Sequence, residues 1–274
     1  MKAHRLAFFL IPATILFVGC NRQSTNIENT EDEDTEVSEK PITFQTFSAK
    51  ESNNAIDIDF EATLPEPDGD QVLTNICTDL LSVFRYSSSI SDPQAILDRK
   101  LQEEKIRLTE IYNEMLESSL DDPFGYEVPQ MTLYENISHV SSNKYFMTFA
   151  ITDMMYEGGA HGGSGKTYKT YDMTTGYLLD ENSFLTNKSA VSNLLRTKAL
   201  KEYTRENPDF DVFDKDNISA NGNFLITPDS IVYQFGEYEI AAYCYGRPAF
   251  RLNKNDVKPY IKPNSPVYLY WFGE

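Results

Sequence analysis

The first globular pattern along the chain is an alternation of apolar and polar residues over 55–62. Ile56, Ile58 and Phe60 fall on one face of this segment, and three acidic side chains fall on the other. Successive side chains of a strand point to opposite faces of a sheet. The period of two therefore predicts a strand with one buried face and one solvated face.

Two stretches that follow have the period of an amphipathic helix. Apolar residues recur every three or four positions in 72–84 and again, more sparsely, in 97–115. The second stretch is preceded by Asp92-Pro93, which is a usual combination of an N-cap and a first helical residue. We therefore predict a short helix and then a longer one, each with a single apolar stripe.

The second half of the chain is richer in strand patterns. Segments 131–140 and 145–156 are separated by a short polar turn, and a further strand at 167–174 follows a glycine-rich loop. A helix is predicted over 191–203, and two strands then flank a turn at 228–230. Strands that are grouped together, and do not alternate with helices, indicate an α+β fold with an antiparallel sheet packed against helices.

The N-terminus carries a different signal. Two basic residues precede an unbroken apolar run from 6 to 18, and Cys20 follows just after it. This arrangement is typical of a secretory signal peptide, and the run is too short to span a bilayer as a helix. Residues 16–20 also resemble the lipobox of bacterial lipoproteins. The resemblance implies that 1–19 is removed and that Cys20 carries the lipid, the only part expected to contact the membrane.

The next segment, 20–40, contains no aromatic residue, and seven acidic residues fall between 28 and 39. Like charges repel one another, so this segment is predicted to be an extended, flexible tether between the anchor and the folded body. The folded body comprises a strand–helix–helix part, 41–128, and a strand-rich part, 129–274. We expect these two parts to form one compact unit.

Composition narrows the class of function. The 274 residues include 42 acidic and 24 basic side chains, and the net charge of −18 argues against binding to nucleic-acid phosphates. An apolar fraction of 41% is enough to build a hydrophobic core. Three cysteines and three histidines provide few ligands for a metal, so we expect neither a metal nor a cofactor.

With Cys20 assigned to the lipid, Cys77 and Cys244 remain. Cys77 falls on the apolar face of the first predicted helix, and Cys244 falls in an apolar segment that is predicted to be a strand. A disulfide between them is compatible with the oxidising compartment to which a signal peptide leads. Two separate buried thiols are equally compatible with the pattern, because free cysteine packs well in cores.

Catalytic and nucleotide-binding motifs are not supported. Segment 160–167 matches a loose P-loop, but the residues after Lys166 have the pattern of a strand, whereas a P-loop needs a helix there. A nucleotide is therefore not expected as a ligand. No G-x-S-x-G elbow accompanies His139 or His161, and neither histidine has a partner at metal-ligand spacing. We therefore assign no catalytic residue.

The glycine-rich loop carries a family signature. Segment 156–162 reads Tyr-Glu-Gly-Gly-Ala-His-Gly, and 171–176 reads Tyr-Asp-Met-Thr-Thr-Gly. Farther on, 238–246 matches the run Y-E-I-A-x-Y-x-x-G. Together these motifs resemble the PdaC/RsiV-like domain over about 131–261, and 237–246 resembles its closing strand. The loop residues assigned as a candidate binding or structural site are Tyr156, Gly158, Gly159, His161 and Gly162.

The resemblance implies a binding module. In deacetylases of the PdaC type this domain accompanies a separate catalytic domain, and in anti-sigma factors of the RsiV type it is the sensor that binds lysozyme. No deacetylase motif occurs in the present sequence. We therefore expect a non-catalytic lipoprotein of the bacterial cell envelope that binds a cationic protein such as lysozyme, or a cell-wall glycan. An enzyme acting on cell-wall glycan and a structural surface component are the alternatives.

Overall fold

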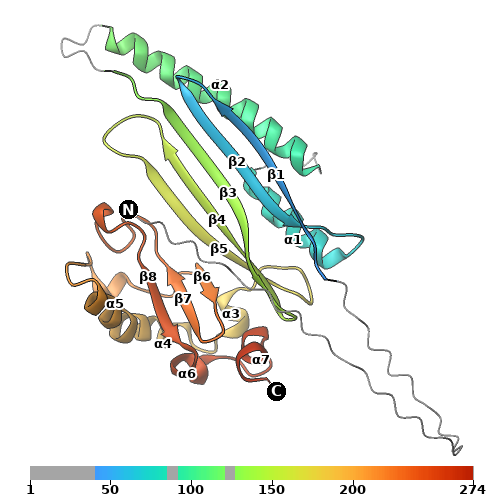
Figure 1. Cartoon of the computed structure of the whole chain (residues 1–274). Helices are drawn as coiled ribbons and strands as arrows, with labels where there is room; N and C mark the ends of the chain where they lie inside the picture. Colours follow the sequence, from blue (N-terminus) through green and yellow to red (C-terminus); the bar gives the residue numbers. More distant parts are fainter. Residues whose placement is uncertain (1–40, 85–91, 121–126, 274) are drawn as a thin grey trace, which may run out of the picture. The chain divides into compact units, whose positions relative to one another are not determined.

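The computed structural model describes residues 41–84, 92–120 and 127–273. The expected signal peptide, the lipidated Cys20 and the acidic tether at 20–40 lie outside these residues. Pro41–Glu274 form one compact unit, which contains two β-sheets (Figure 1). None of the helices in the described ranges combines the length and the apolar character of a bilayer-spanning segment.

The first sheet has five strands in the order β1-β2-β3-β4-β5. Their bounds are Phe44–Ser52, Ile56–Pro65, Met131–Ser142, Phe146–Tyr156 and Gly163–Asp172. All neighbouring strands are antiparallel except β2 and β3, which run parallel. Parallel neighbours need a long crossover, and here two helices supply it between β2 and β3. The predicted α+β class is thus confirmed, with a sheet that is mixed and mostly antiparallel.

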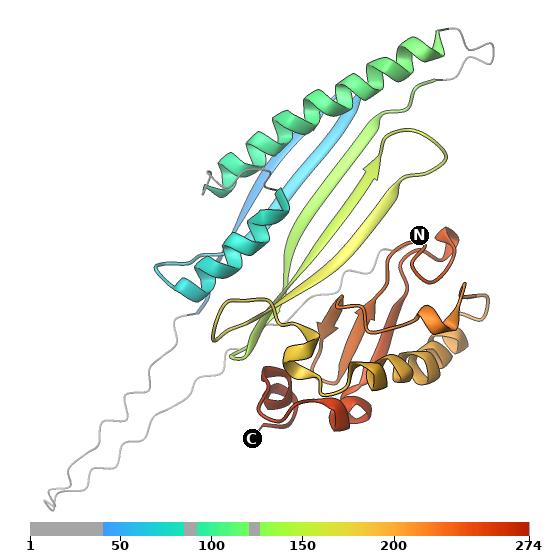
Figure 2. The same ribbon diagram turned by 180° about the vertical axis from the view of Figure 1, so that it is seen from behind.

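The two crossover helices, α1 (Gln71–Leu81) and α2 (Pro93–Ser119), lie on one face of the five-stranded sheet (Figure 2). Both begin where capping residues satisfy the free backbone amides of the first turn. The Asp70 carboxylate accepts hydrogen bonds from the first turn of α1. Asp92 caps α2 and Pro93 is its first residue, as the sequence predicts. A 3₁₀ turn, Ser82–Phe84, extends α1.

The core under these helices confirms the alternation predicted for β2. Ile56, Ile58 and Phe60 are at most 1% exposed, and they belong to the same core as Leu97 of α2. The acidic side chains on the opposite face are partly solvated. Burial of the apolar face against α1 and α2 is therefore the main force that holds this sheet and its helices together.

The second sheet is smaller and entirely antiparallel, in the order β6-β7-β8. Its strands are Phe224–Ile226, Ser230–Gln234 and Ala249–Asn253, so the hairpin expected around 228–230 is confirmed. Around it lie α3 (Glu181–Phe184), α4 (Lys188–Leu194), a π-helical turn (Leu195–Ala199), α5 (Leu200–Glu206), α6 (Lys254–Val257) and α7 (Pro266–Phe272). Short 3₁₀ turns occur at Lys215–Asn217, Tyr243–Tyr245 and Lys258–Tyr260.

The hydrophobic residues form two cores, and their division differs from the sequence-based boundary at 128/129. Strands β3 to β5 pack mainly in the core of β1, β2, α1 and α2, although they were grouped with the C-terminal part. Strand β4 serves both cores, because alternate side chains of a strand point to opposite faces. Phe149 lies in the first core, and Phe146 lies in the second.

The rejection of the P-loop is confirmed, because Lys166 lies inside β5 and no helix follows it; β5 begins at Gly163, earlier than the predicted residue 167. One local prediction is wrong. The expected closing strand at 237–246 is instead a turn followed by the 3₁₀ turn Tyr243–Tyr245. Tyr238 and Gly246 have positive φ, at 60° and 63°, and left-handed residues interrupt an extended strand.

Of the two alternatives left open for the cysteines, the structure has two free thiols, although Cys244 is not buried as expected. Cys77 and Cys244 are both free thiols in the structure, so the disulfide is not formed there. Cys77 is partly buried and donates a hydrogen bond to the carbonyl of Pro65, with the two atoms 3.1 Å apart. Burial raises the pKa of this thiol to about 11. Cys244 is exposed because its segment is a 3₁₀ turn at the surface and not a buried strand.

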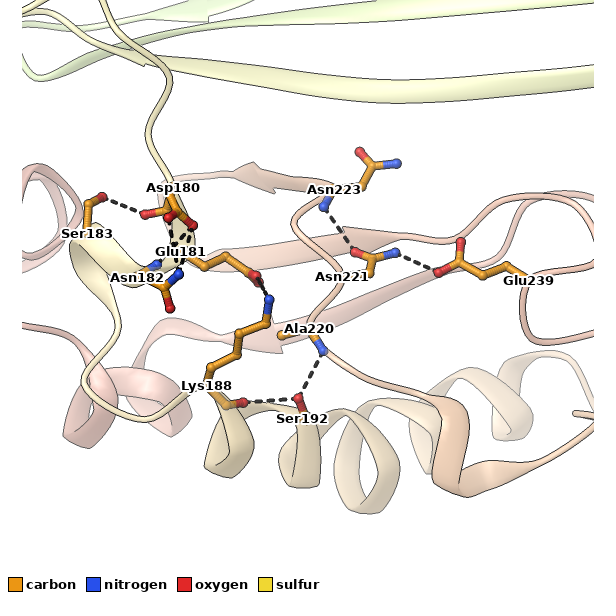
Figure 3. Close-up of polar contacts among 10 residues, drawn as sticks. All are labelled: Asp180, Glu181, Asn182, Ser183, Lys188, Ser192, Ala220, Asn221, Asn223 and Glu239. Carbon is orange, nitrogen blue, oxygen red and sulfur yellow. Dashed lines mark hydrogen bonds and ion pairs between the residues drawn. The ribbon is translucent and has the colours of Figure 1, made fainter.

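The outer edge of β5 is closed by the C-terminal part of the chain. The side-chain amide of Asn223 accepts a hydrogen bond from the Tyr168 N–H (2.9 Å) and donates one to the Lys166 carbonyl (2.8 Å). This amide therefore occupies the place of a peptide group on a neighbouring strand. Asn221 accepts a bond from the Asn223 N–H and donates one to Glu239 (Figure 3). We call the contacts of β5 with Asn223 the β5 joint.

We expect Asn223→Ala to lower the free energy of unfolding by about 1–2 kcal/mol, because two backbone groups of β5 lose their partner. Urea denaturation of the folded body, residues 41–274, measures this free energy. Asn255→Ala is a matched control, since the Asn255 side chain is exposed on α6. Equal midpoints for the two variants would show that the β5 joint does not stabilise the fold.

Candidate functional site

Two motif segments that lie far apart in the sequence meet at one place on the surface. The loop 157–162, which we call the glycine loop, connects β4 to β5, and the segment 236–247 follows β7. The backbone N–H and the hydroxyl of Ser164 both donate hydrogen bonds to the Glu237 carboxylate. The Tyr243 hydroxyl donates to the carbonyl of Gly162 (3.1 Å). The family-like motifs therefore form a single site.

At the centre of the site three rings lie one against another. The His161 imidazole stacks on the Tyr243 ring, with ring centroids 4.0 Å apart and the planes inclined by 19°. The Tyr238 ring stacks on the same tyrosine, with centroids 5.6 Å apart. We call His161, Tyr238 and Tyr243 the aromatic stack. The separation of the two tyrosine rings lies within the range of about 4.5–7 Å that favourable ring pairs prefer, and the imidazole lies closer to Tyr243 than this range.

Hydrogen bonds determine the protonation pattern of His161. Its Nδ1 lies 2.9 Å from the carbonyl oxygen of Gly162, which has no proton to give, so Nδ1 must be the donor. Its Nε2 lies 3.2 Å from the hydroxyl of Tyr238. In the neutral ring Nε2 is then the acceptor of the tyrosine proton. A single tautomer thus holds the imidazole between the glycine loop and Tyr238.

Tyr238 is the most unusual member of the stack. It is 54% exposed, although a tyrosine ring gains free energy from burial. Its backbone is also left-handed, with φ of 60°, which is uncommon for a large side chain. Backbone strain of this kind costs of order 1–3 kcal/mol and is concentrated at functional sites. The fold therefore maintains an exposed ring at a position where stability alone would not favour it.

The glycine loop has a defined conformation. Gly158 and Gly159 are left-handed, with φ of 90° and 96°. A Cβ on Gly162 would lie 2.8 Å from the carbonyl oxygen of Met155, so a larger residue does not fit there. The Tyr156 hydroxyl donates a hydrogen bond to the Gly159 carbonyl (3.0 Å). The five residues singled out from the sequence thus lie together where β4 is joined to β5, with Tyr156 as the last residue of β4 and the other four in the glycine loop.

A groove of paired charges lies beside the glycine loop, on the side of α2. Glu157 of the loop pairs with Arg107, whose other partner is Glu104. The buried Lys100 lies 3.2 Å from Glu135. Burial raises the pKa of Glu135, and the charge of Lys100 opposes that shift. The opposite charges in this groove pair with one another and link α2 to the loop, although Oε2 of Glu135 is buried without a hydrogen-bond partner among the described residues.

The sequence alone identified only half of this site. Glu237, Tyr238 and Tyr243 were assigned to a closing strand and not to the site. Tyr238 is 77 positions from His161, and the only local signal was that both belong to family-like motifs. Among the described residues, no group of three or more His, Cys, Asp or Glu side chains is arranged to hold a metal ion.

The glycine loop yields a graded prediction for stability. Gly158→Ala should cost more than about 1 kcal/mol, because its φ is positive and its Cβ would also displace the flexible end of the Met115 side chain, whose Cε lies 2.6 Å away. Gly159→Ala should cost about 1 kcal/mol, because only its φ is unfavourable. Gly163→Ala is the control, since its Cβ would meet no atom within 4 Å and its φ is not positive. Denaturant midpoints that are the same for all three would contradict a locked loop.

Comparisons with known proteins give a family match for one segment and a likeness in fold for most of the chain. Residues 178–255 match the family described as "Protein of unknown function (DUF3298)". A crystal structure of a DUF3298 family member from Bacteroides fragilis NCTC 9343 aligns with a TM-score of 0.70 at 15% identity, over 84% of this chain and 97% of that one. The crystal structure of a DUF3298 family protein from Pseudomonas aeruginosa PAO1 aligns with a TM-score of 0.56 at 15% identity, over 82% of this chain and 96% of that one.

No curated protein matches the chain. The matched segment contains Tyr238, Tyr243 and the β5 joint residue Asn223, whereas the glycine loop precedes it in the sequence. The two solved structures extend the likeness in fold to most of the chain. Residues 178–255 therefore match the DUF3298 family model, and the chain shares the α+β fold of two solved DUF3298 proteins.

Proposed function

We propose that this protein is a non-catalytic binding module, anchored by lipid in the bacterial cell envelope, whose partner contacts the aromatic stack. The observation that carries the proposal is Tyr238, an exposed ring on a strained backbone. Tyrosine is enriched among residues that dominate binding energy in interfaces. An exposed aromatic ring that the fold maintains at a cost in stability is accounted for by a partner that buries it.

The rigidity of the stack supports this role. Tyr243 donates to the Gly162 carbonyl, and His161 is held through both of its ring nitrogens. A surface that already has its bound conformation loses little conformational entropy when it associates. The stack is therefore better suited to recognition than a flexible loop of the same composition.

Charge indicates the class of partner. The chain has a net charge of −18, and Glu237 and Glu239 flank Tyr238 directly in the sequence. A negative field accelerates the approach of a cationic protein and weakens encounters with anionic ones. We therefore favour a cationic protein such as lysozyme. A cell-wall glycan is the second candidate, because a sugar ring also packs on the flat face of an exposed tyrosine.

Binding of lysozyme by the soluble body should weaken at least tenfold in Tyr238→Ala, because the ring supplies the main apolar contact. His161→Ala should also weaken binding, since it removes the partner of the Tyr238 hydroxyl. Tyr177→Ala is the matched control, as Tyr177 is 68% exposed beyond the far end of β5. Titration calorimetry and thermal melts separate affinity from stability.

The outcomes distinguish the two candidate partners. Saturable binding of a soluble glycan fragment, with no binding of lysozyme and the same loss in Tyr238→Ala, would replace the protein partner by a glycan. Unchanged affinity in Tyr238→Ala and His161→Ala for whichever partner binds would remove the aromatic stack from the proposal.

The location is tested through the anchor. Cys20→Ala should release the protein from the membrane fraction of the producing cells, because the apolar run over 6–18 is too short to remain as a stable span. Fractionation followed by detection of the folded body measures this. A cleaved Cys20→Ala protein that still sediments with membranes would contradict the lipid anchor.

A further inference from the structure

The helix that covers one side of the second sheet is interrupted by the π-helical turn Leu195–Ala199. The Leu200 N–H donates to the carbonyl of Leu195, five residues earlier, so one extra residue is inserted between α4 and α5. Such insertions are rare and are found frequently at functional sites, because they shift side chains out of the regular helical register. Arg196 and Leu200, which lie in and just after this turn, both line one cavity.

This cavity has a volume of about 290 Å³ and lies between the helix and the segment that follows it. Leu200, Phe210 and Val212 give it an apolar surface, and the first two are less than 10% exposed. Arg196, Lys201 and Lys215 surround this surface, with Asp211 as the acid among the lining residues. A small apolar pocket with a few polar groups is the usual form of a small-molecule site.

The positive charge of the cavity contrasts with the rest of the chain, whose net charge is −18. Lys201 and Lys215 make no ion pair and no side-chain hydrogen bond with any other residue in the described ranges. Arg196 is held in position by a hydrogen bond from Nη1 to the carbonyl of Ile218 (2.9 Å). Its guanidinium group has no carboxylate partner in those ranges.

Other lysines of the same helix are neutralised by partners. Lys188 of α4 lies 2.6 Å from the carboxylate of Glu181, which is only 1% exposed (Figure 3). Lys198, in the π-helical turn, pairs with Asp256. Cations bonded only to backbone carbonyls, such as Lys254 and Lys262, also occur elsewhere in the described ranges, but at this cavity three cations without a carboxylate partner lie together. Their convergence at one cavity suggests that the missing partner is a ligand.

We propose that this cavity binds a small organic anion, a carboxylate or a phosphate monoester attached to a compact apolar group. Arg196, Lys201 and Lys215 bind the charged end, because a guanidinium and two ammonium groups supply several donors to its oxygen atoms. Leu200, Phe210 and Val212 cover the apolar end. The site is separate from the aromatic stack and does not depend on the function proposed for it.

The test is a titration of the ¹⁵N-labelled soluble body with hexanoate and with hexyl phosphate, followed by NMR. We expect saturable shifts of the amide signals of Arg196, Thr204 and Phe210 with at least one of the two. The same anion should bind at least tenfold more weakly to Lys201→Gln/Lys215→Gln. Lys144→Gln/Lys166→Gln, which removes the same charge from outside the cavity, should bind as the unaltered protein does.

Each arm of the experiment has a defined meaning. Binding of hexanoate alone assigns a carboxylate, and binding of hexyl phosphate alone assigns a phosphate monoester. The neutral analogue 1-hexanol should bind at least tenfold more weakly than the anion. The proposal is overturned if neither anion saturates the cavity signals, if 1-hexanol binds equally well, or if the two double variants lose affinity to the same extent.

Discussion

The interaction on which the rest of the structure depends is the closure of the outer edge of β5. An open edge exposes backbone donors and acceptors that must find partners, and it invites pairing with other chains. Here the amide of Asn223 and the carboxylate of Glu237 supply those partners from the C-terminal part of the chain. The backbone of 177–179 supplies two more hydrogen-bond partners, because the Tyr177 carbonyl accepts from the Asp172 N–H and the Leu179 N–H donates to the Thr170 carbonyl. The first sheet therefore ends against the C-terminal part, and no sixth strand is required.

The candidate site is a consequence of this closure. The glycine loop leads into β5, and 236–247 follows β7, whose Gln234 N–H donates to the Asn223 carbonyl. The β5 joint therefore brings the two segments together. His161 and Tyr243 then stack, and Tyr238 is held with its ring in solvent. The unfavourable backbone conformation of Tyr238 persists because these contacts stabilise it.

Charge is used in two different ways within one acidic chain. Beside the glycine loop, the buried Lys100 and Glu104 pair with each other, and Lys100 also pairs with the half-buried Glu135. Their desolvation offsets much of the attraction between them, so such a cluster contributes more to a single arrangement of α2 than to stability. At the cavity near the π-helical turn, Lys201 and Lys215 lack acidic partners among the described residues. The cations beside the glycine loop pair with acids of the same chain, whereas the cations of the cavity are those that we propose to bind an anion from outside it.

The sequence by itself determined the features that depend on neighbouring residues. The alternation over 55–62 predicted the buried face of β2, Asp92-Pro93 predicted the start of α2, and the residues after Lys166 excluded a P-loop helix. Only the tertiary structure decided that β2 and β3 run parallel, that 237–246 turns instead of forming a strand, and that Cys244 is exposed. It also decided that His161 meets Tyr238. Side-chain period and capping act over a few residues, whereas strand pairing and ring stacking join segments that the sequence separates by tens of positions.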